Sequence, residues 1–177
     1  MTLVTDKKPY VAAVKGIMAF RFLADYEAYD LLETSELGRY EEGEPIVEEG
    51  DVAPLLYGIL EGTVGVSVRE AEGRQVYVNA LGAGDVFGEA GIFTSVRRTA
   101  TVTAQGPALV LAVHRDKLSR FLKEHPEAGN KILLVIIYGL LRKLKVANQE
   151  LAYERKSDLD QEGVDAMVAS MFGDGKA

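Results

Sequence analysis

Residues 87–102 contain the side chains and glycines needed to bind a small anion that also carries a hydroxyl group. Arg98 is a permanent cation, and its planar guanidinium can bind two phosphate oxygens at once. Glu89 accepts hydrogen bonds when ionised, so it suits a ligand hydroxyl and repels a bare phosphate. Together, these two residues favour a phosphorylated sugar over inorganic phosphate.

The residues beside this pair are small and leave the backbone accessible. Gly88 has no Cβ, which allows a ligand to approach the backbone closely. Residues 89–93, including Ala90, are predicted to form one short helical turn whose free N–H groups point toward the anion. Thr99 adds a hydroxyl group, and Ala100 is small enough to leave its own N–H exposed. All of these positions are therefore candidate ligand contacts.

This segment resembles the phosphate-binding cassette of the cyclic nucleotide-binding domain family. The resemblance runs from about Ala19 to about Tyr153 and implies that the ligand is cAMP or cGMP. It further implies that Glu89 holds the ribose 2′-hydroxyl and that Arg98 holds the cyclic phosphate. The other matching positions, in family order, are Tyr40, Glu42, Gly43, Glu44, Ile46, Gly50, Asp51, Leu56, Tyr57, Ile59, Gly62, Val64, Leu81, Gly84 and Asp85.

The resemblance also implies contacts outside the cassette. Val66, Asn79 and Leu81 line the base and sugar side of the pocket if the strand register matches, because a slip of one residue turns each side chain to the opposite face. Asn148 has two interpretations: a base contact from a long helix, as in the catabolite activator protein branch, or a polar residue that sets helix register. Thr99 does not distinguish cAMP from cGMP.

The sequence pattern predicts an α+β fold built on a small antiparallel β-roll or jelly-roll barrel. Between residues 41 and 103, short β-rich runs alternate with glycine turns, and a hairpin tip is expected at Glu72–Gly73. Helical spacing precedes and follows this region. The expected divisions are a helical segment at 1–36, a β-roll at 37–115 with the cassette at 84–102, helices at 116–156, and an acidic tail at 157–177.

Residues 127–156 predict a helix about 45 Å long, which is longer than a small domain needs. Residues 132–136 are expected to pack on the barrel, and the part beyond residue 140 is not. A coiled-coil seam predicts a parallel homodimer, although the whole helix packing on its own barrel remains an alternative. The seam residues follow steps of four and three and are Ile137, Leu141, Leu144, Asn148 and Leu151.

Composition narrows the possible functions. The chain has 177 residues, is 47% hydrophobic and carries a net charge of −7, so a broad basic face and a direct nucleic acid partner are not expected. It has no cysteine, which excludes disulfides and thiolate metal sites. His114 and His125 do not form a metal-binding cluster, and no catalytic constellation is present, so no enzyme activity, metal or cofactor is expected. The N-terminus lacks an apolar signal core, which favours a cytoplasmic protein.

These features predict a stand-alone cyclic nucleotide receptor that signals through a protein partner or a change in assembly. Transcription factors of the family carry a basic helix-turn-helix domain after the long helix, whereas residues 157–177 are short and acidic. DNA binding is therefore not inferred from the resemblance. The alternative is a structural or dimerisation module of the same fold with no physiological nucleotide ligand.

Overall fold

A computed structural model describes residues 1–70, 73–94 and 97–172, with side chains as far as Gln149. The chain divides into two compact units, Met1–Ile136 and Ile137–Ala177, and each is described by itself. Glu72, at the expected hairpin tip, lies outside the described residues. Gly73 has a φ of 81° and donates a backbone hydrogen bond to Glu70, as expected for a turn.

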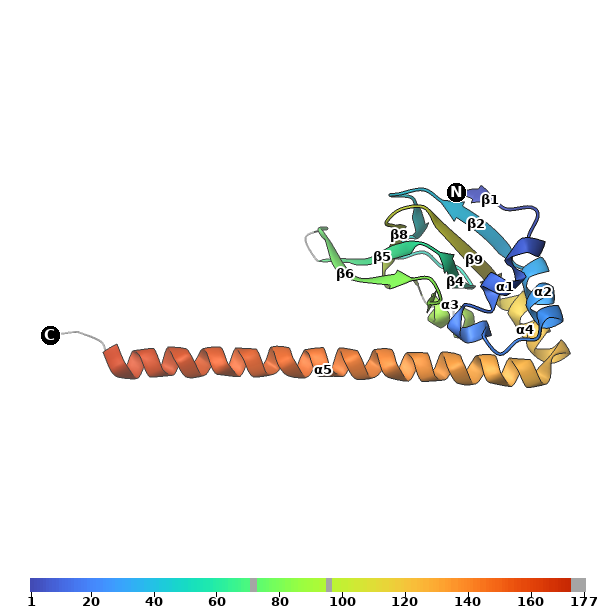
Figure 1. Cartoon of the computed structure of the whole chain (residues 1–177). Coiled ribbons are helices and arrows are strands. Elements are labelled where there is room, and N and C mark those ends of the chain that lie inside the picture. The colour runs from blue at the N-terminus through green and yellow to red at the C-terminus, as the bar shows by residue number, and fades with distance from the viewer. Residues whose placement is uncertain (71–72, 95–96, 173–177) are drawn as a thin grey trace. The chain divides into compact units, whose positions relative to one another are not determined.

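The elements alternate from helices to strands and back to helices (Figure 1). The strands are β1 (Thr2–Leu3), β2 (Glu36–Tyr40), β3 (Pro45–Val47), β4 (Leu55–Glu61), β5 (Thr63–Arg69), β6 (Gln75–Gly82), β7 (Val86–Phe87), β8 (Thr101–Ala104) and β9 (Ala108–His114). The α-helices are α1 (Val11–Val14), α2 (Asp25–Glu33), α3 (Glu89–Phe93), α4 (Arg115–Glu124) and α5 (Pro126–Phe172), and the 3₁₀ helices are η1 (Lys8–Tyr10) and η2 (Met18–Phe20).

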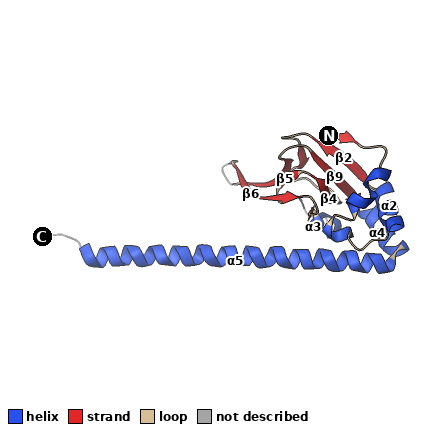
Figure 2. Ribbon diagram, viewed as in Figure 1, coloured by secondary structure: helices blue, strands red, loops and turns tan. Residues whose placement is uncertain are grey.

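The strands form two antiparallel sheets, which confirms the predicted α+β class (Figure 2). One sheet has five strands in the order β1-β2-β9-β4-β7, and the other has four strands in the order β3-β8-β5-β6. Consecutive strands often lie in different sheets, so the chain passes between the sheets repeatedly. This arrangement brings the segment between β7 and β8, which contains the cassette, next to the start of β4.

The central strands β4 and β9 are apolar on both faces because each face packs on a different hydrophobic cluster. Leu56 of β4 and Val113 of β9 are paired and point to a cluster shared with the helices. Their neighbours Tyr57 and Ala112 point to a second cluster between the sheets. A strand buried on both faces has a nearly continuous apolar sequence, as these two do.

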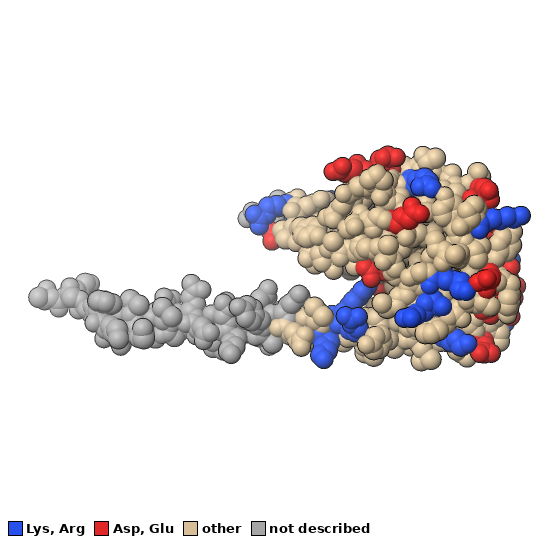
Figure 3. Space-filling view, viewed as in Figure 1, with Lys and Arg blue, Asp and Glu red and all other residues tan. Residues whose placement is uncertain are grey.

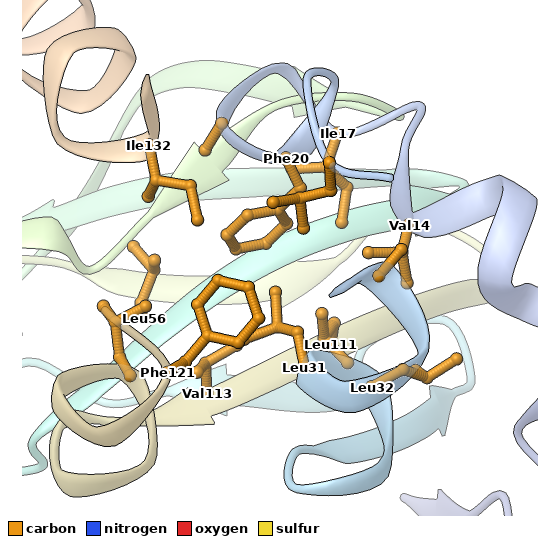
Figure 4. Close-up of a cluster of buried hydrophobic side chains, with 14 of the residues drawn as sticks. Val14, Ile17, Phe20, Leu31, Leu32, Leu56, Leu111, Val113, Phe121 and Ile132 are labelled. Carbon is orange, nitrogen blue, oxygen red and sulfur yellow. The ribbon is translucent and has the colours of Figure 1, made fainter. Parts of the chain in front are cut away.

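The cluster beneath the helices joins distant parts of the first unit. Figure 4 shows the rings of Phe20 and Phe121 in its interior, with Ile132 reaching it from α5. Ile132 and Ile136 are 1% and 2% exposed, so the expectation that residues 132–136 pack on the barrel is confirmed. On the face shown in Figure 3, acidic and basic side chains are interspersed over this unit.

Helix α5 is longer than the sequence analysis expected. It runs for 47 residues to Phe172 and does not end near Lys156. Its one proline stands at the first position, and beyond Lys156 only the isolated Gly163 weakens the helical pattern before Phe172. The expected boundary at residue 157 is therefore not a helix end. Among the described residues, no helix has the length and apolar character needed to cross a membrane.

In the second unit, α5 exposes the apolar side chains of the predicted seam. Ile137, Leu141 and Leu144 are 49%, 60% and 57% exposed, and Asn148 is also exposed. The side chain of Leu151 lies outside the described residues. The seam side chains that the structure describes are therefore exposed, and they form an apolar stripe on α5.

Candidate anion-binding site

The cassette contains the short helix that the sequence predicts. Helix α3 spans Glu89–Phe93, with the expected bounds, and Gly88 is its N-cap with a φ of 77°. A left-handed backbone of this kind favours glycine. No side chain caps the first turn of α3, and its N–H groups provide the partial positive charge that attracts anions.

Arg98 is buried beside this helix and holds three backbone carbonyl groups. Its side chain is 8% exposed. Nη1 donates to the carbonyl oxygen of Gly88 at 3.0 Å, and Nη2 donates to those of Ala53 and Leu55 at 2.8 Å each. The guanidinium therefore ties the N-terminus of α3 to the segment that leads into β4. The sequence analysis assigned Arg98 to a ligand phosphate and did not anticipate this structural role.

Part of the Arg98 guanidinium has no partner. Nε is buried and has no hydrogen bond among the described residues. A guanidinium carries five N–H donors, and the three bonds to carbonyls leave two of them available. A buried donor without an acceptor costs about 1–3 kcal/mol, so an anion that accepted from it would be stabilised there.

Two glycines make the space that the guanidinium occupies. A Cβ on Gly88 would lie 2.7 Å from Nη1 of Arg98 and 3.0 Å from the carbonyl oxygen of Leu55. A Cβ on Gly91 would lie 2.7 Å from the same nitrogen and 2.8 Å from the carbonyl oxygen of Ala53. The sequence analysis explained Gly88 by close approach of a ligand. In the structure, the group that approaches it closely is the Arg98 side chain.

Tyr57 forms the other side of the Arg98 environment. The Arg98 guanidinium carbon lies 5.6 Å from the centre of the Tyr57 ring, which stacks on Phe87 at 4.8 Å. Burial raises the pKa of Tyr57, and the positive charge of Arg98 partly opposes this effect. The ring is therefore neutral near pH 7 and adds a cation–π attraction that holds the guanidinium in place.

Glu89 lies in the first turn of α3, where a negative charge is favoured by the helix dipole. Its side chain is only 7% exposed. A buried carboxylate must be satisfied by hydrogen bonds or charges, and its assignment to a ligand hydroxyl stays a prediction. The structure thus buries Glu89 and Arg98, the two polar side chains on which the sequence analysis depends.

The smaller cassette positions vary in exposure. Ala90 and Thr99 are exposed, and Ala100 is half-buried. Ser95 and Val96, inside the expected cassette at 84–102, lie outside the described residues. Arg97 is exposed and donates to the carbonyl oxygen of Gly50 at 2.9 Å, so it is separate from the Arg98 cluster.

The strand register places the three base-side candidates on one face. Val66 pairs with Asn79, and Val64 pairs with Leu81. Paired residues of an antiparallel ladder point to the same side, and Val64 is fully buried between the sheets. Val66 and Leu81 pack against that interior cluster, while Asn79 is exposed. The register of this ladder shifts directly after Val66, between Val66 and Ser67, and the role of these three residues as base and sugar contacts stays a prediction.

Asn148 is the one candidate ligand contact outside the first unit. It lies on α5 within Ile137–Ala177 and is described with that unit alone. Both interpretations of Asn148, a base contact and a register residue, therefore remain predictions.

Arg115 belongs to the same hydrogen-bonded group as Arg98, and the sequence analysis missed it. Its Nη2 donates to the carbonyl oxygens of Gly91 and Thr94 at the end of α3, at 2.7 and 2.9 Å. It is also the first residue of α4, where the helix dipole disfavours a cation. A cation at the start of a helix was the available sequence signal that this side chain has an acceptor elsewhere in the fold.

The two histidines have local contacts. His114 is the N-cap of α4 and accepts a hydrogen bond from the backbone of Asp116. His125 lies between α4 and α5, with Nε2 3.3 Å from a carboxylate oxygen of Asp30. Within residues 1–70, 73–94 and 97–149, whose side chains the structure describes, no group of three or more His, Cys, Asp or Glu side chains is arranged to hold a metal ion.

Comparison with known families identifies a domain over the part of the chain that contains this site. The sequence model of the cyclic nucleotide-binding domain matches residues 37–125, half of the chain. A CRP-like cAMP-activated global transcriptional regulator of Mycobacterium tuberculosis is 31% identical over 110 residues, covering 62% of this chain and 47% of the relative. The cAMP-dependent protein kinase type II regulatory subunit of Drosophila melanogaster is 33% identical over 106 residues, covering 60% of this chain and 28% of the relative. The chain thus matches less than half of either relative.

Solved structures share the fold. The catabolite activator protein of Thermus thermophilus is 26% identical with a TM-score of 0.66, covering 75% of this chain and 61% of that one. A cyclic nucleotide-binding domain from Methylobacillus flagellatus has a TM-score of 0.73 at 21% identity, covering 81% of this chain and 83% of that one, which shows likeness of fold alone.

The space around Arg98 gives a stability prediction. Gly91→Ala is expected to lower the free energy of unfolding by about 1–3 kcal/mol, because the added Cβ forces Arg98 or the Ala53 carbonyl to move. Urea unfolding followed by circular dichroism measures the effect. The control is Gly139→Ala, whose Cβ meets no atom within 4 Å and which should be neutral or stabilising. Equal behaviour of the two variants would contradict the steric argument.

Proposed function

Because this chain belongs to the cyclic nucleotide-binding domain family, we propose that it is a receptor for cAMP or cGMP. The ligand binds at the cassette, with its phosphate on Arg98 and the N-terminus of α3 and its ribose 2′-hydroxyl on Glu89. Val66, Asn79 and Leu81 contact the base and sugar side. Binding shifts the population between two arrangements of cassette and helices, because the ligand has different affinities for them.

One observation carries this proposal. Arg98 is buried beside the uncapped N-terminus of α3, and its buried Nε–H has no acceptor among the described residues. An anion at this place would satisfy that donor and interact with the positive end of the helix dipole. The names of the two curated relatives, a cAMP-activated regulator and a cAMP-dependent kinase subunit, add support for a cyclic nucleotide as that anion.

We propose that the output of the receptor goes through a protein partner or through a change in assembly. The folded unit that contains the cassette also contains α4 and the first turns of α5, which pack in one hydrophobic cluster. A movement of the cassette can therefore reach α4 and the first turns of α5 through packed side chains. The relatives named above are regulators, and the described residues contain no metal-binding cluster that would favour a metal-dependent enzyme.

A second candidate function follows from the carbonyl contacts of Arg98. Three hydrogen bonds to backbone oxygens give Arg98 a structural role that needs no ligand. The same chain would then act as a structural or dimerisation module that retains the fold without a physiological nucleotide. Calorimetric titration with cAMP and cGMP distinguishes the two functions, because only the receptor binds at micromolar or lower concentrations of nucleotide.

Substitution of Arg98 tests the phosphate assignment. Arg98→Leu is expected to weaken nucleotide binding by about tenfold to a hundredfold, since a hydrogen bond to a charged group contributes about 1.5–3 kcal/mol. Isothermal titration calorimetry gives the affinities, and circular dichroism checks that each variant is folded. The matched control is the exposed neighbour, Arg97→Leu, which should bind nearly as well as the wild type. Unchanged affinity in folded Arg98→Leu would remove Arg98 from the site.

A modified ligand tests the role of Glu89. The wild-type chain is expected to bind 2′-deoxy-cAMP at least about tenfold more weakly than cAMP, because a buried carboxylate loses its hydroxyl donor. In Glu89→Gln, the difference between the two ligands should shrink, which a double-mutant cycle measures directly. Equal affinity of the wild type for both ligands would show that the ribose assignment is wrong.

We also propose that two copies of the chain form a parallel homodimer through α5. The support comes from Ile137, Leu141 and Leu144, which are spaced as a coiled-coil seam and exposed, with Asn148 as the polar position.

The seam leads to a prediction about mass in solution. Leu141→Glu is expected to convert the dimer to a monomer, because it places like charges at the core of the seam. Light scattering after gel filtration should give a mass near 19.3 kDa for this variant and twice that for the wild type. The control is Arg142→Glu, one position off the seam, which should remain dimeric. A wild-type chain that is monomeric at all concentrations would contradict the dimer.

A further inference from the structure

We infer that Arg115 is a positioning residue that ties the cassette helix α3 to α4 and transmits movement of the cassette to α4. The inference rests on the proposed function, because the movement is the one that a cyclic nucleotide induces. Arg115 itself makes no proposed contact with the nucleotide.

The contacts of Arg115 join three segments. Its guanidinium donates from Nη2 to the carbonyl oxygens of Gly91 and Thr94, at 2.7 and 2.9 Å. Its backbone N–H donates to the carbonyl oxygen of Pro54 at 2.8 Å. The first residue of α4 is therefore fixed both to the end of α3 and to the segment before β4.

These tertiary contacts hold Arg115 at the first position of α4, where the helix itself does not favour a cation. A cation in the first turn of a helix lies at the unfavourable end of its dipole. The Nε of Arg115 is buried without a hydrogen bond among the described residues, which adds a further cost. The last carbonyl groups of a helix are not all paired within it, and those of Gly91 and Thr94 accept from the guanidinium.

Arg98 and Arg115 both form hydrogen bonds to α3 and to residues 53–55. The carbonyl oxygens of Ala53 and Leu55 accept from Arg98, and the one between them, on Pro54, accepts from Arg115. On α3, Arg98 holds the N-cap carbonyl of Gly88, and Arg115 holds the two carbonyls at the other end. A phosphate that binds the remaining donors of Arg98 therefore acts on a guanidinium that is bonded to the same segments as Arg115.

Helix α4 is able to pass the displacement onward. Leu118 and Phe121 of α4 lie in the same hydrophobic cluster as Ile132 and Ile136 of α5. A Cβ on Gly129 would lie 2.9 Å from the side chain of Leu122, so the first turns of α5 are in close contact with α4. An apolar path also exists, because Ile92 of α3 packs in this cluster. The experiment must therefore separate the polar link from the apolar one.

Hydrogen–deuterium exchange of α4 with and without saturating cAMP tests the inference. In the wild type, cAMP should change the exchange of backbone amides in residues 116–124. In Arg115→Gln, this change should be largely lost at saturation, although cAMP still binds. Arg115→Lys should restore part of it, because the lysine ammonium keeps the charge and can donate to a carbonyl oxygen, although it lacks the planar fork of arginine. The matched control is Arg120→Gln on the same helix, since Arg120 is exposed and has no hydrogen bond or ion pair among the described residues.

The outcomes distinguish this inference from the proposed function. If the wild type binds no cyclic nucleotide, the proposed function is wrong and this inference falls with it. If the wild type binds and Arg115→Gln shows the full change in α4, the receptor stands and only the inference about Arg115 is wrong, leaving the Ile92 packing as the path. If Arg115→Gln does not fold, the comparison is made with Arg115→Lys, where an undiminished change equally overturns the inference.

Discussion

The burial of one cation organises the site. A guanidinium removed from water is stable only where its N–H groups find acceptors, and Arg98 finds them in three backbone carbonyls from two separate segments. These bonds fix the N-terminus of α3 against the start of β4. They also explain the two glycines, because a side chain on Gly88 or Gly91 would occupy the space of the guanidinium. The geometry of the cassette follows from satisfying Arg98.

The hydrogen bonds of Arg98 to the cassette also bear on how the proposed ligand would bind. The donors that an incoming phosphate would use belong to the same planar group that holds Gly88, Ala53 and Leu55. A ligand that accepts from the two remaining donors therefore shares one rigid guanidinium with the cassette. A conformational change requires a difference in affinity between two states, and a guanidinium shared by ligand and cassette supplies such a difference where its position differs between them.

The sequence predicted the features that depend on neighbouring residues. The bounds of α3 and the β-roll follow from local spacing and alternation. The acceptors of Arg98 on Ala53 and Leu55 lie 45 and 43 residues away and are backbone atoms, which leave no mark in the side-chain pattern. Arg115 was missed for the same reason. The end of α5 was misplaced because the sequence between Lys156 and Phe172 contains no proline and only one isolated glycine to mark a helix end.

The two parts of α5 follow different constraints. Ile132 and Ile136 are buried in the core that also holds α4, whereas Ile137, Leu141 and Leu144 are exposed. Burial of apolar area contributes about 25 cal/mol per Å², so an exposed apolar stripe forgoes this stabilisation until another surface covers it. The buried turns belong to the unit that contains the cassette, and the exposed turns continue directly from them. The first turns of α5 are therefore stabilised by the core of the first unit, whereas the exposed stripe gains no such stabilisation from the residues that the structure describes.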